Sequence, residues 1–130
     1  MTPPVSPRRV LIADDDEDMR ELLHLVLSGA SYTVVGAAAD GPSAVELWRK
    51  QRAEGLCAVI LDERMPGMYG VDVAMAIRSE DPDQTVILFS AYIDEVTNER
   101  ARKAGIAACI PKQDVLSLPT HPVLREACDH

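Results

Sequence analysis

The sequence predicts an α/β fold, a doubly wound parallel sheet of five strands with helices on both faces. Five short apolar runs recur along the 130 residues, and helical patterns lie between them. The runs are continuous rather than alternating, which is typical of strands buried on both faces. Regular alternation of strand and helix then favours a parallel sheet with right-handed crossovers.

The predicted strands cover residues 10–13, 33–39, 57–61, 85–89 and 107–110. Parallel sheets bind ligands beyond the carboxyl ends of their strands. The residues that directly follow these runs are therefore the candidates for a functional site.

The first three helices have clear local signals. After the first strand, apolar residues with the spacing of a single helical stripe predict a helix: Met19, Leu22, Leu23, Val26 and Leu27. Asp40-Gly41-Pro42 predicts the start of the second helix, because proline is favoured in a first turn. The third helix covers about residues 70–78 and ends before Asp81-Pro82.

The last two helices have weaker signals. Residues 93–105 form a fourth helix with few apolar positions, so we expect thin packing and mobility. Pro119 and Pro122 restrict the last helix to about Pro122 onward. Residues 1–8 contain three prolines and are predicted to be a disordered leader, which leaves residues 9–130 as one domain.

Composition narrows the class of protein. The formal net charge is -8 and the sequence pI about 4.7, so the surface should repel nucleic-acid phosphates and anionic membranes. No apolar run approaches the roughly 20 residues that span a bilayer, and the first residues lack the apolar core of a signal peptide. We expect a cytoplasmic protein that binds neither nucleic acid nor membrane directly.

The three cysteines, Cys57, Cys109 and Cys128, show no CxxC spacing, so neither a disulfide nor a zinc site is predicted. Cys57 and Cys109 lie in apolar runs and are expected to be buried, unreactive thiols. His121, Cys128 and His130 are close in sequence, but their spacing matches no metal-binding pattern.

Polar residues follow four of the five runs. Asp14 and Asp15 come after the first, Asp62 after the third, Ser90 after the fourth, and Lys112 soon after the fifth. Carboxylates within about 4 Å repel by several kcal/mol per pair at an effective dielectric near 20. Mg²⁺, which usually takes one or two carboxylates, is the cation that suits so small a set.

These groups are the parts needed to transfer a phosphoryl group to Asp62. Such a transfer depends mainly on positioning and on positive charge near the equatorial oxygens. Asp62 would act as the nucleophile and form an acyl phosphate.

The chain resembles the receiver domains of two-component response regulators over about residues 8–128. The resemblance rests on four motifs in the family's order: VLIADD, VILDERMPGMYG, ILFSA and the lysine of CIPKQD. It implies a flavodoxin-like sheet with strand order 2-1-3-4-5. It also implies that Asp62 accepts the phosphoryl group, that Ser90 reaches toward it, and that Lys112 contacts one of its oxygens.

The same resemblance implies a Mg²⁺ site. Asp15, Asp62 and the backbone carbonyl of Arg64 would bind the ion directly, and Asp14 would act through water. The other acids of the run, Asp16, Glu17 and Asp18, need no catalytic role, because negative charge is favoured at a helix N-terminus.

The implied function is a signalling switch rather than an enzyme. A sensor histidine kinase would donate the phosphoryl group, and autodephosphorylation would return the domain to its unphosphorylated state. The face formed by the fourth helix, the fifth strand and the last helix would then bind an output domain, an effector protein or a second copy of the chain.

Several residues depart from the family pattern. Cys109 stands where an aromatic switch residue is common, and Tyr69 where an Asp is frequent. Gln113 follows the motif lysine where many receivers have a cis proline, so we predict a trans peptide there. Arg64 and Tyr92 would flank the mouth of the site and influence the lifetime of the phosphorylated state.

Three other readings account for parts of the pattern. The chain could be a receiver-like docking module that is never phosphorylated. A small phosphatase of the haloacid-dehalogenase type would use Asp14 as nucleophile and Asp16 as acid, although that fold is usually larger. An EF-hand is excluded, because Met19 stands where its loop needs glycine.

Overall fold

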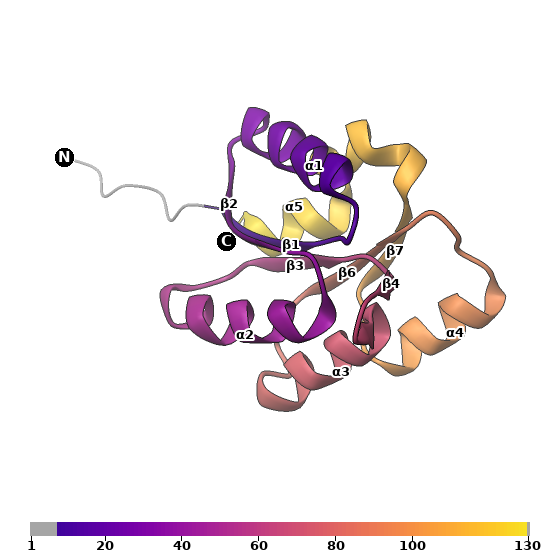
Figure 1. Ribbon diagram of the computed structural model, residues 1–130. Helices are drawn as coiled ribbons and strands as arrows, with labels where there is room; N and C mark the ends of the chain where they lie inside the picture. The colour runs from indigo at the N-terminus through magenta and orange to yellow at the C-terminus, as the bar shows by residue number, and fades with distance from the viewer. Residues whose placement is uncertain (1–7, 130) are drawn as a thin grey trace.

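A computed structural model describes residues 8–129 and shows a sheet between two layers of helices (Figure 1). The sheet is parallel throughout, with order β2-β1-β3-β6-β7. Its strands are β1 (Arg8–Ala13), β2 (Tyr32–Ala38), β3 (Ala58–Leu61), β6 (Val86–Ser90) and β7 (Ala108–Pro111). This order is the predicted 2-1-3-4-5, because the labels β4 and β5 belong to a separate hairpin.

That hairpin was not predicted from the sequence. It consists of β4 (Arg64–Met65) and β5 (Met68–Tyr69), which pair antiparallel in the loop after β3. Gly67 lies in its turn with a φ of 85°, a conformation that glycine adopts without steric cost. The hairpin forms one side of the region beyond the carboxyl ends of the strands.

The five predicted helices are present: α1 (Glu17–Gly29), α2 (Gly41–Gln51), α3 (Gly70–Glu80), α4 (Glu95–Lys103) and α5 (Pro122–Cys128). Their starts follow the predicted signals. Asp40 caps α2, because its carboxylate accepts a hydrogen bond from the backbone N–H of Ser43 at 2.8 Å. Asp16 caps α1 in the same way, accepting from the N–H of Asp18 at 3.0 Å.

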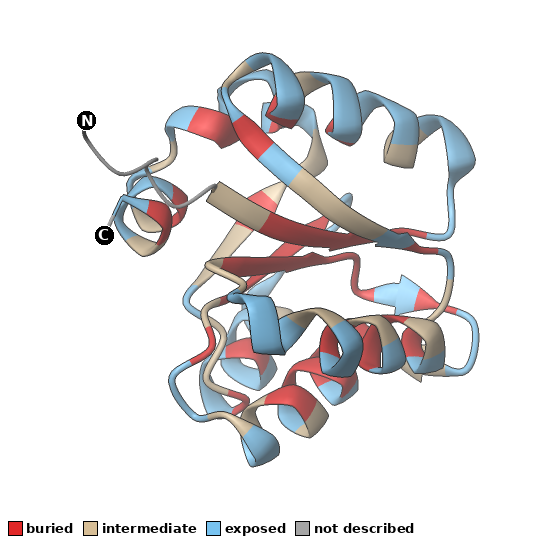
Figure 2. Cartoon of the chain, turned by 90° about the vertical axis from the view of Figure 1, so that its left-hand side faces the viewer, coloured by how far each residue is buried: buried red, intermediate tan, exposed pale blue. Residues whose placement is uncertain are grey.

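The two faces of the sheet carry separate hydrophobic clusters, and buried residues line the strands (Figure 2). Helices α2 and α3 cover one face, while α1 and α5 cover the other (Figure 1). Trp48 of α2 is fully buried, and its indole N–H donates to the Oε1 of Gln84 at 2.9 Å. Gln84 precedes β6, so Trp48 lies toward the edge of the sheet opposite the carboxyl ends of its strands.

Helix α4 packs thinly, as its composition predicts. Ala101 is its only buried residue. Asp94 caps its N-terminus by accepting from the N–H of Thr97 at 2.8 Å. Few buried contacts make this helix the easiest of the five to displace.

The segment between β7 and α5 holds 3-10 turns, η2 (Lys112–Thr120), that were not predicted. The hydroxyl of Tyr32 donates to the carbonyl of Pro119 at 2.8 Å and fixes this segment to β2. Every peptide bond within residues 8–129 is trans, including the one between Lys112 and Gln113. A shorter 3-10 segment, η1 (Arg52–Glu54), follows α2.

The expectation that no disulfide forms was wrong. Cys57, just before β3, and Cys128, the last residue of α5, are bonded across 71 residues, and their Cα atoms lie 5.0 Å apart. Spacing in the sequence carries no information about this proximity, because α5 must first dock on the sheet. Cys109 is the remaining cysteine and has a free, half-buried thiol.

The predicted leader lies outside the described residues except for Arg8, which begins β1. His130, one of the three residues noted above as close in sequence, also lies outside the described residues. His121, another of the three, accepts a hydrogen bond at its imidazole Nδ1 from the backbone N–H of Val123 at 3.2 Å. Among the described helices, none has both the length and the apolar character needed to cross a membrane.

Candidate functional site

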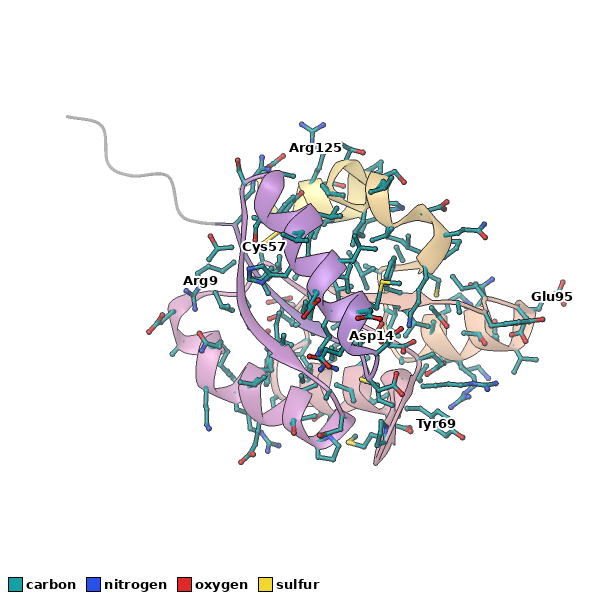
Figure 3. All side chains as sticks on the ribbon, turned by 45° about the horizontal axis from the view of Figure 1, so that its top comes forward. Arg9, Asp14, Cys57, Tyr69, Glu95 and Arg125 are labelled. Atoms are coloured by element: carbon teal, nitrogen blue, oxygen red, sulfur yellow. A yellow bond between two sulfur atoms is a disulfide. The ribbon has the colours of Figure 1, made fainter. Side chains whose placement is uncertain are left out.

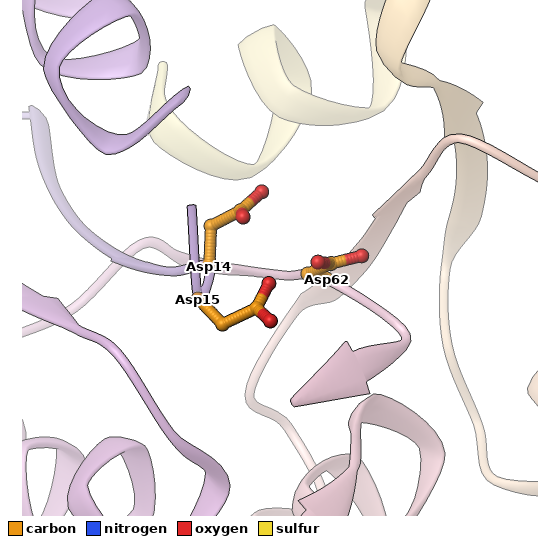
Figure 4. Close-up of side chains that lie close together, drawn as sticks. All are labelled: Asp14, Asp15 and Asp62. Carbon is orange, nitrogen blue, oxygen red and sulfur yellow. The ribbon is translucent and has the colours of Figure 1, made fainter. Parts of the chain in front are cut away.

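Three carboxylates meet beyond the carboxyl ends of β1 and β3, as predicted. Asp14, Asp15 and Asp62 each place one carboxylate oxygen within 4.8 Å of the others (Figure 4). Asp14 is fully buried and Asp62 is 6% exposed, while Asp15 is exposed to solvent. The cluster is therefore open on the side of Asp15.

Lys112 places a positive charge between two of these carboxylates. Its Nζ lies 2.8 Å from the Oδ2 of Asp14 and 3.0 Å from the Oδ2 of Asp62. Burial lowers the pKa of the Lys112 ammonium, but its bonds to both carboxylates outweigh that effect and leave the pKa above its ordinary value. Lys112 is therefore charged, and it neutralises only part of the cluster.

The pKa of Asp62 is raised above its ordinary value, chiefly by burial. The hydrogen bond from Lys112 opposes this rise, and the charge of Asp14 adds to it. The ionised carboxylate is thus held in an unfavourable environment, which further positive charge would relieve.

Ser90, the last residue of β6, lines the same cavity as Asp62 but turns its hydroxyl to the following loop. The Oγ of Ser90 donates a hydrogen bond to the carbonyl of Tyr92 at 3.2 Å. The same Oγ accepts a hydrogen bond from the backbone nitrogen of Tyr92 at 3.3 Å. Ser90 is therefore close to the cluster but bonded to backbone rather than to a carboxylate.

A cavity of about 1270 Å³ extends from Asp62 and Lys112 to the hairpin and α4. Arg64 and Tyr92, which were predicted to flank the site, line this cavity, and so does Tyr69. On the far side, the guanidinium carbon of Arg100 lies 5.6 Å from the centre of the Tyr69 ring, so a cation–π contact joins α4 to the hairpin.

Glu63 is a site residue that sequence analysis missed. It is 7% exposed, and its Oε1 accepts from the N–H of Val71 at 3.2 Å, while its carbonyl accepts from the N–H of Gly70 at 2.8 Å. Its Oε2 has no hydrogen-bond partner among the described residues. The only sequence signal was a second acid directly after Asp62.

Gly70 is the reason that α3 can begin so close to Asp62. A Cβ atom at position 70 would lie 2.3 Å from the carbonyl oxygen of Asp62, which is far inside van der Waals contact. Glu63 accepts hydrogen bonds from the first two amides of α3, so the loop after β3 is bonded to the start of this helix.

Comparison with known proteins agrees with this geometry. A family model described as the response regulator receiver domain matches residues 10–118. The chain is 40% identical over 106 residues to the transcriptional regulatory protein PdtaR of Mycobacterium tuberculosis, covering 82% of this chain and 50% of PdtaR. It is 35% identical over 105 residues to the chemotaxis protein CheY of Thermotoga maritima, covering 81% of this chain and 85% of CheY.

Solved structures show the same fold. The signal receiver domain of the putative response regulator NarL from Mycobacterium tuberculosis superposes with a TM-score of 0.79 at 35% identity, over 97% of this chain and 96% of that one. The chain spans about half the length of PdtaR. From the family match, the relatives and the carboxylate–lysine cluster, we conclude that the chain belongs to the response regulator receiver domain family.

Proposed function

We propose that this chain is a phosphorylation switch in which a sensor histidine kinase transfers a phosphoryl group to Asp62. The observation that carries the proposal is the position of Asp62, beside two further carboxylates and 3.0 Å from the ammonium of Lys112. The nucleophile Asp62 and the cation Lys112 thus lie together at one edge of the sheet. The carboxylate cluster there retains negative charge that a second cation would neutralise.

The donor set fits Mg²⁺. Three carboxylates and one ammonium leave a negative balance, and hard divalent cations take oxygen ligands of this kind. Asp15 and Asp62 would bind the ion directly together with the carbonyl of Arg64. Asp14 would act through water, because its Oδ1 accepts from the N–H of Asp16 at 2.9 Å and its Oδ2 is held by Lys112.

The transfer itself needs one nucleophile and few other groups. A carboxylate oxygen of Asp62 attacks phosphorus, the bond from phosphorus to the kinase histidine nitrogen breaks, and the electron pair of that bond stays on the imidazole. The product is an acyl phosphate on Asp62. Bound Mg²⁺ would supply positive charge to the phosphoryl oxygens, and the Lys112 ammonium would stabilise another of them.

The phosphorylated state would differ from the present one at Ser90. The new group carries about -2 charge near neutral pH, which favours any hydroxyl that donates to it. Ser90 would leave its bonds to Tyr92 and turn toward the phosphoryl group. Because Tyr92 precedes α4, this rearrangement would reach the helix with the thinnest packing.

The responding surface is the face formed by α4, β7 and α5. Its partner would be an output domain, an effector protein or a second copy of the chain, and the switch works if the two states differ in affinity for that partner. Half-buried Cys109 of β7 stands where an aromatic switch residue is common, so we do not expect the usual aromatic readout here. We place this signalling in the cytoplasm, with no direct contact of the domain to nucleic acid or membrane.

Intact mass spectrometry after incubation with acetyl phosphate and Mg²⁺ tests the acceptor. The chain should gain the mass of one phosphoryl group, and the gain should disappear with a chelator or in Asp62→Asn. Asp72→Asn is the matched control, because Asp72 lines the same cavity without belonging to the carboxylate cluster, and this variant should still be modified.

The other readings predict different masses. Modification that survives in Asp62→Asn would favour Asp14 as the acceptor of a phosphatase. The structure weakens that reading, because Asp16, its required acid, is exposed and caps α1. No modification of the wild type with acetyl phosphate or a kinase would favour a docking module.

A further inference from the structure

A covalent bridge joins α5 to the strand that carries Asp62 at its other end. Cys57, labelled in Figure 3, directly precedes β3. Cys128 ends α5, and the Cα atoms of the two cysteines lie 5.0 Å apart across 71 residues. We propose that this cysteine pair is a reversible redox modification site, independent of phosphoryl chemistry, whose co-reactant is a thiol–disulfide couple.

The two ends of the bridge are held with different strength. Cys57 belongs to the sheet: its backbone N–H donates to the carbonyl of Arg9 at 2.9 Å, and β3 then continues as a fully buried strand. Helix α5 has seven residues, of which only Leu124 and Cys128 are buried. Opening the bridge would therefore loosen the end of the helix and leave the strand in place.

A shallow cleft beside α5 weakens its packing further. It has a volume of about 270 Å³ and is lined by Val123, Glu126 and Ala127 of the helix, with Thr85 and Ala107 from the segments before β6 and β7. The end of α5 is held to the sheet by Cys128 and by an ion pair, because the carboxylate of Asp129 lies 2.6 Å from the guanidinium of Arg8 in β1. The disulfide adds a covalent restraint to this exposed ion pair, and reduction would leave only the noncovalent contacts.

The reaction is a thiol–disulfide exchange. A thiolate of the reductant attacks one sulfur of the bridge, the sulfur–sulfur bond breaks, and a mixed disulfide forms. A second thiolate resolves it, so the protein gains two electrons and two protons as two thiols, while the reductant becomes a disulfide. A small disulfide such as oxidised glutathione reverses the exchange.

The modification would act at a distance from the phosphoacceptor. Cys57 lies at the amino end of β3 and Asp62 just beyond its carboxyl end, which separates them by about 16 Å at 3.3 Å per residue. Reduction should loosen α5 without changing the carboxylate cluster. If α5 is part of the responding face, the redox state also sets how that face is presented, and this consequence rests on the proposed function.

Counting thiols tests the site. The chain is equilibrated with defined mixtures of reduced and oxidised glutathione, then denatured with excess N-ethylmaleimide and weighed. We expect one alkylation in oxidising mixtures and three in reducing mixtures, with an intermediate range where both forms exist. Cys109→Ser should show none and two, whereas Cys57→Ser should never form the bridge.

Amide hydrogen exchange tests the consequence for α5. Over labelling times too short for global unfolding, reduction of the wild type should speed exchange in residues 122–128 several-fold, while the amides of β3 and β6 stay protected in both states. Cys57→Ser should exchange at the faster rate with or without reductant, and Cys128→Ser gives the same comparison from the other end of the bridge.

The outcomes separate the two proposals. Three alkylations in every mixture, or one in every mixture, would overturn a reversible site, and equal exchange of α5 in both states would overturn its effect on the helix. If these results hold while acetyl phosphate fails to modify Asp62, the redox site stands and the proposed phosphorylation fails.

Discussion

The ammonium of Lys112 lies 3.0 Å from the Oδ2 of Asp62, although 50 residues separate them in the sequence. The same ammonium lies 2.8 Å from Asp14, so one side chain balances two buried carboxylates. Because removing one member of such a set leaves uncompensated charge, Lys112 should matter for stability as well as for chemistry.

Lys112→Met should lower the unfolding free energy without Mg²⁺ by about 3 kcal/mol, the usual cost of breaking a buried ion pair. Added Mg²⁺ should recover more stability in the variant than in the wild type, because the ion replaces the missing charge. Urea unfolding with and without Mg²⁺ measures both effects. Lys103→Met, on the exposed surface of α4, is the control and should change neither; equal Mg²⁺ effects in all three proteins would contradict the prediction.

Gly70→Ala should destabilise the protein by about 1–3 kcal/mol, the range for overpacking. The new Cβ would press on the Asp62 carbonyl and displace either α3 or the loop after β3. Gly29→Ala is the matched control: its Cβ would meet nothing within 4 Å, so stability should hold or rise slightly. Similar thermal unfolding of the two variants would show that α3 can begin elsewhere.

Cys109 should react slowly with alkylating reagents in the folded protein. Burial, and secondarily the charge of Glu63, raise the pKa of its thiol, so less of the reactive thiolate is present near pH 8. We expect alkylation several-fold slower than in the unfolded chain, and faster in Glu63→Gln than in the wild type. Time-resolved mass spectrometry gives these rates, and a folded rate equal to the unfolded one would be the contrary result.

The Asp94 cap of α4 should make the stability of the protein depend on pH. The hydrogen bond from the backbone N–H of Thr97 holds the pKa of Asp94 below its ordinary value of 3.8. A lowered pKa stabilises the fold above pH 3.8 and loses that effect as pH falls through the pKa of the folded state. The stability difference between wild type and Asp94→Ala should therefore be largest above pH 5 and shrink in acid.

That difference can be followed by urea unfolding between pH 3 and pH 7. Asp83→Ala, an acid in the loop between α3 and β6, serves as a control. A constant difference for Asp94→Ala across the whole range would mean that the cap does not depend on the charge of its carboxylate.

The disulfide should also contribute to global stability. A bridge across 71 residues restricts the unfolded chain, which corresponds to about 4 kcal/mol in the chain-entropy treatment. Reduced wild type and Cys57→Ser should unfold at similar, lower denaturant concentrations than the oxidised protein. A midpoint that is unchanged by reduction would contradict this expectation.

Most of the fold could be predicted because its signals are local. Asp40 and Pro42 mark the start of α2, and apolar runs mark every strand of the main sheet to within two residues. The cluster of Asp14, Asp15 and Asp62 could be predicted because parallel strands present their carboxyl ends at the same edge. Residues that directly follow the strands can therefore be predicted to lie close together without any knowledge of side-chain packing.

The features that the sequence did not predict depend either on tertiary packing or on strands of only two residues. Cys57 and Cys128 meet only because α5 crosses the amino end of β3, and their spacing in the sequence does not indicate it. The two-residue strands of the hairpin are too short for any periodicity. Glu63 is buried because the turn into α3 folds over it, which a second acid in the sequence does not reveal.

The place of the single tryptophan decides what optical spectroscopy can report. Trp48 is fully buried and hydrogen-bonded to Gln84 near the amino edge of the sheet. Its fluorescence emission should therefore change on unfolding but not when the carboxylate of Asp62 is phosphorylated. A fluorescence assay of signalling therefore needs an engineered reporter. Tyr92→Trp would place an indole at the exposed mouth of the cavity, beside the backbone that Ser90 holds.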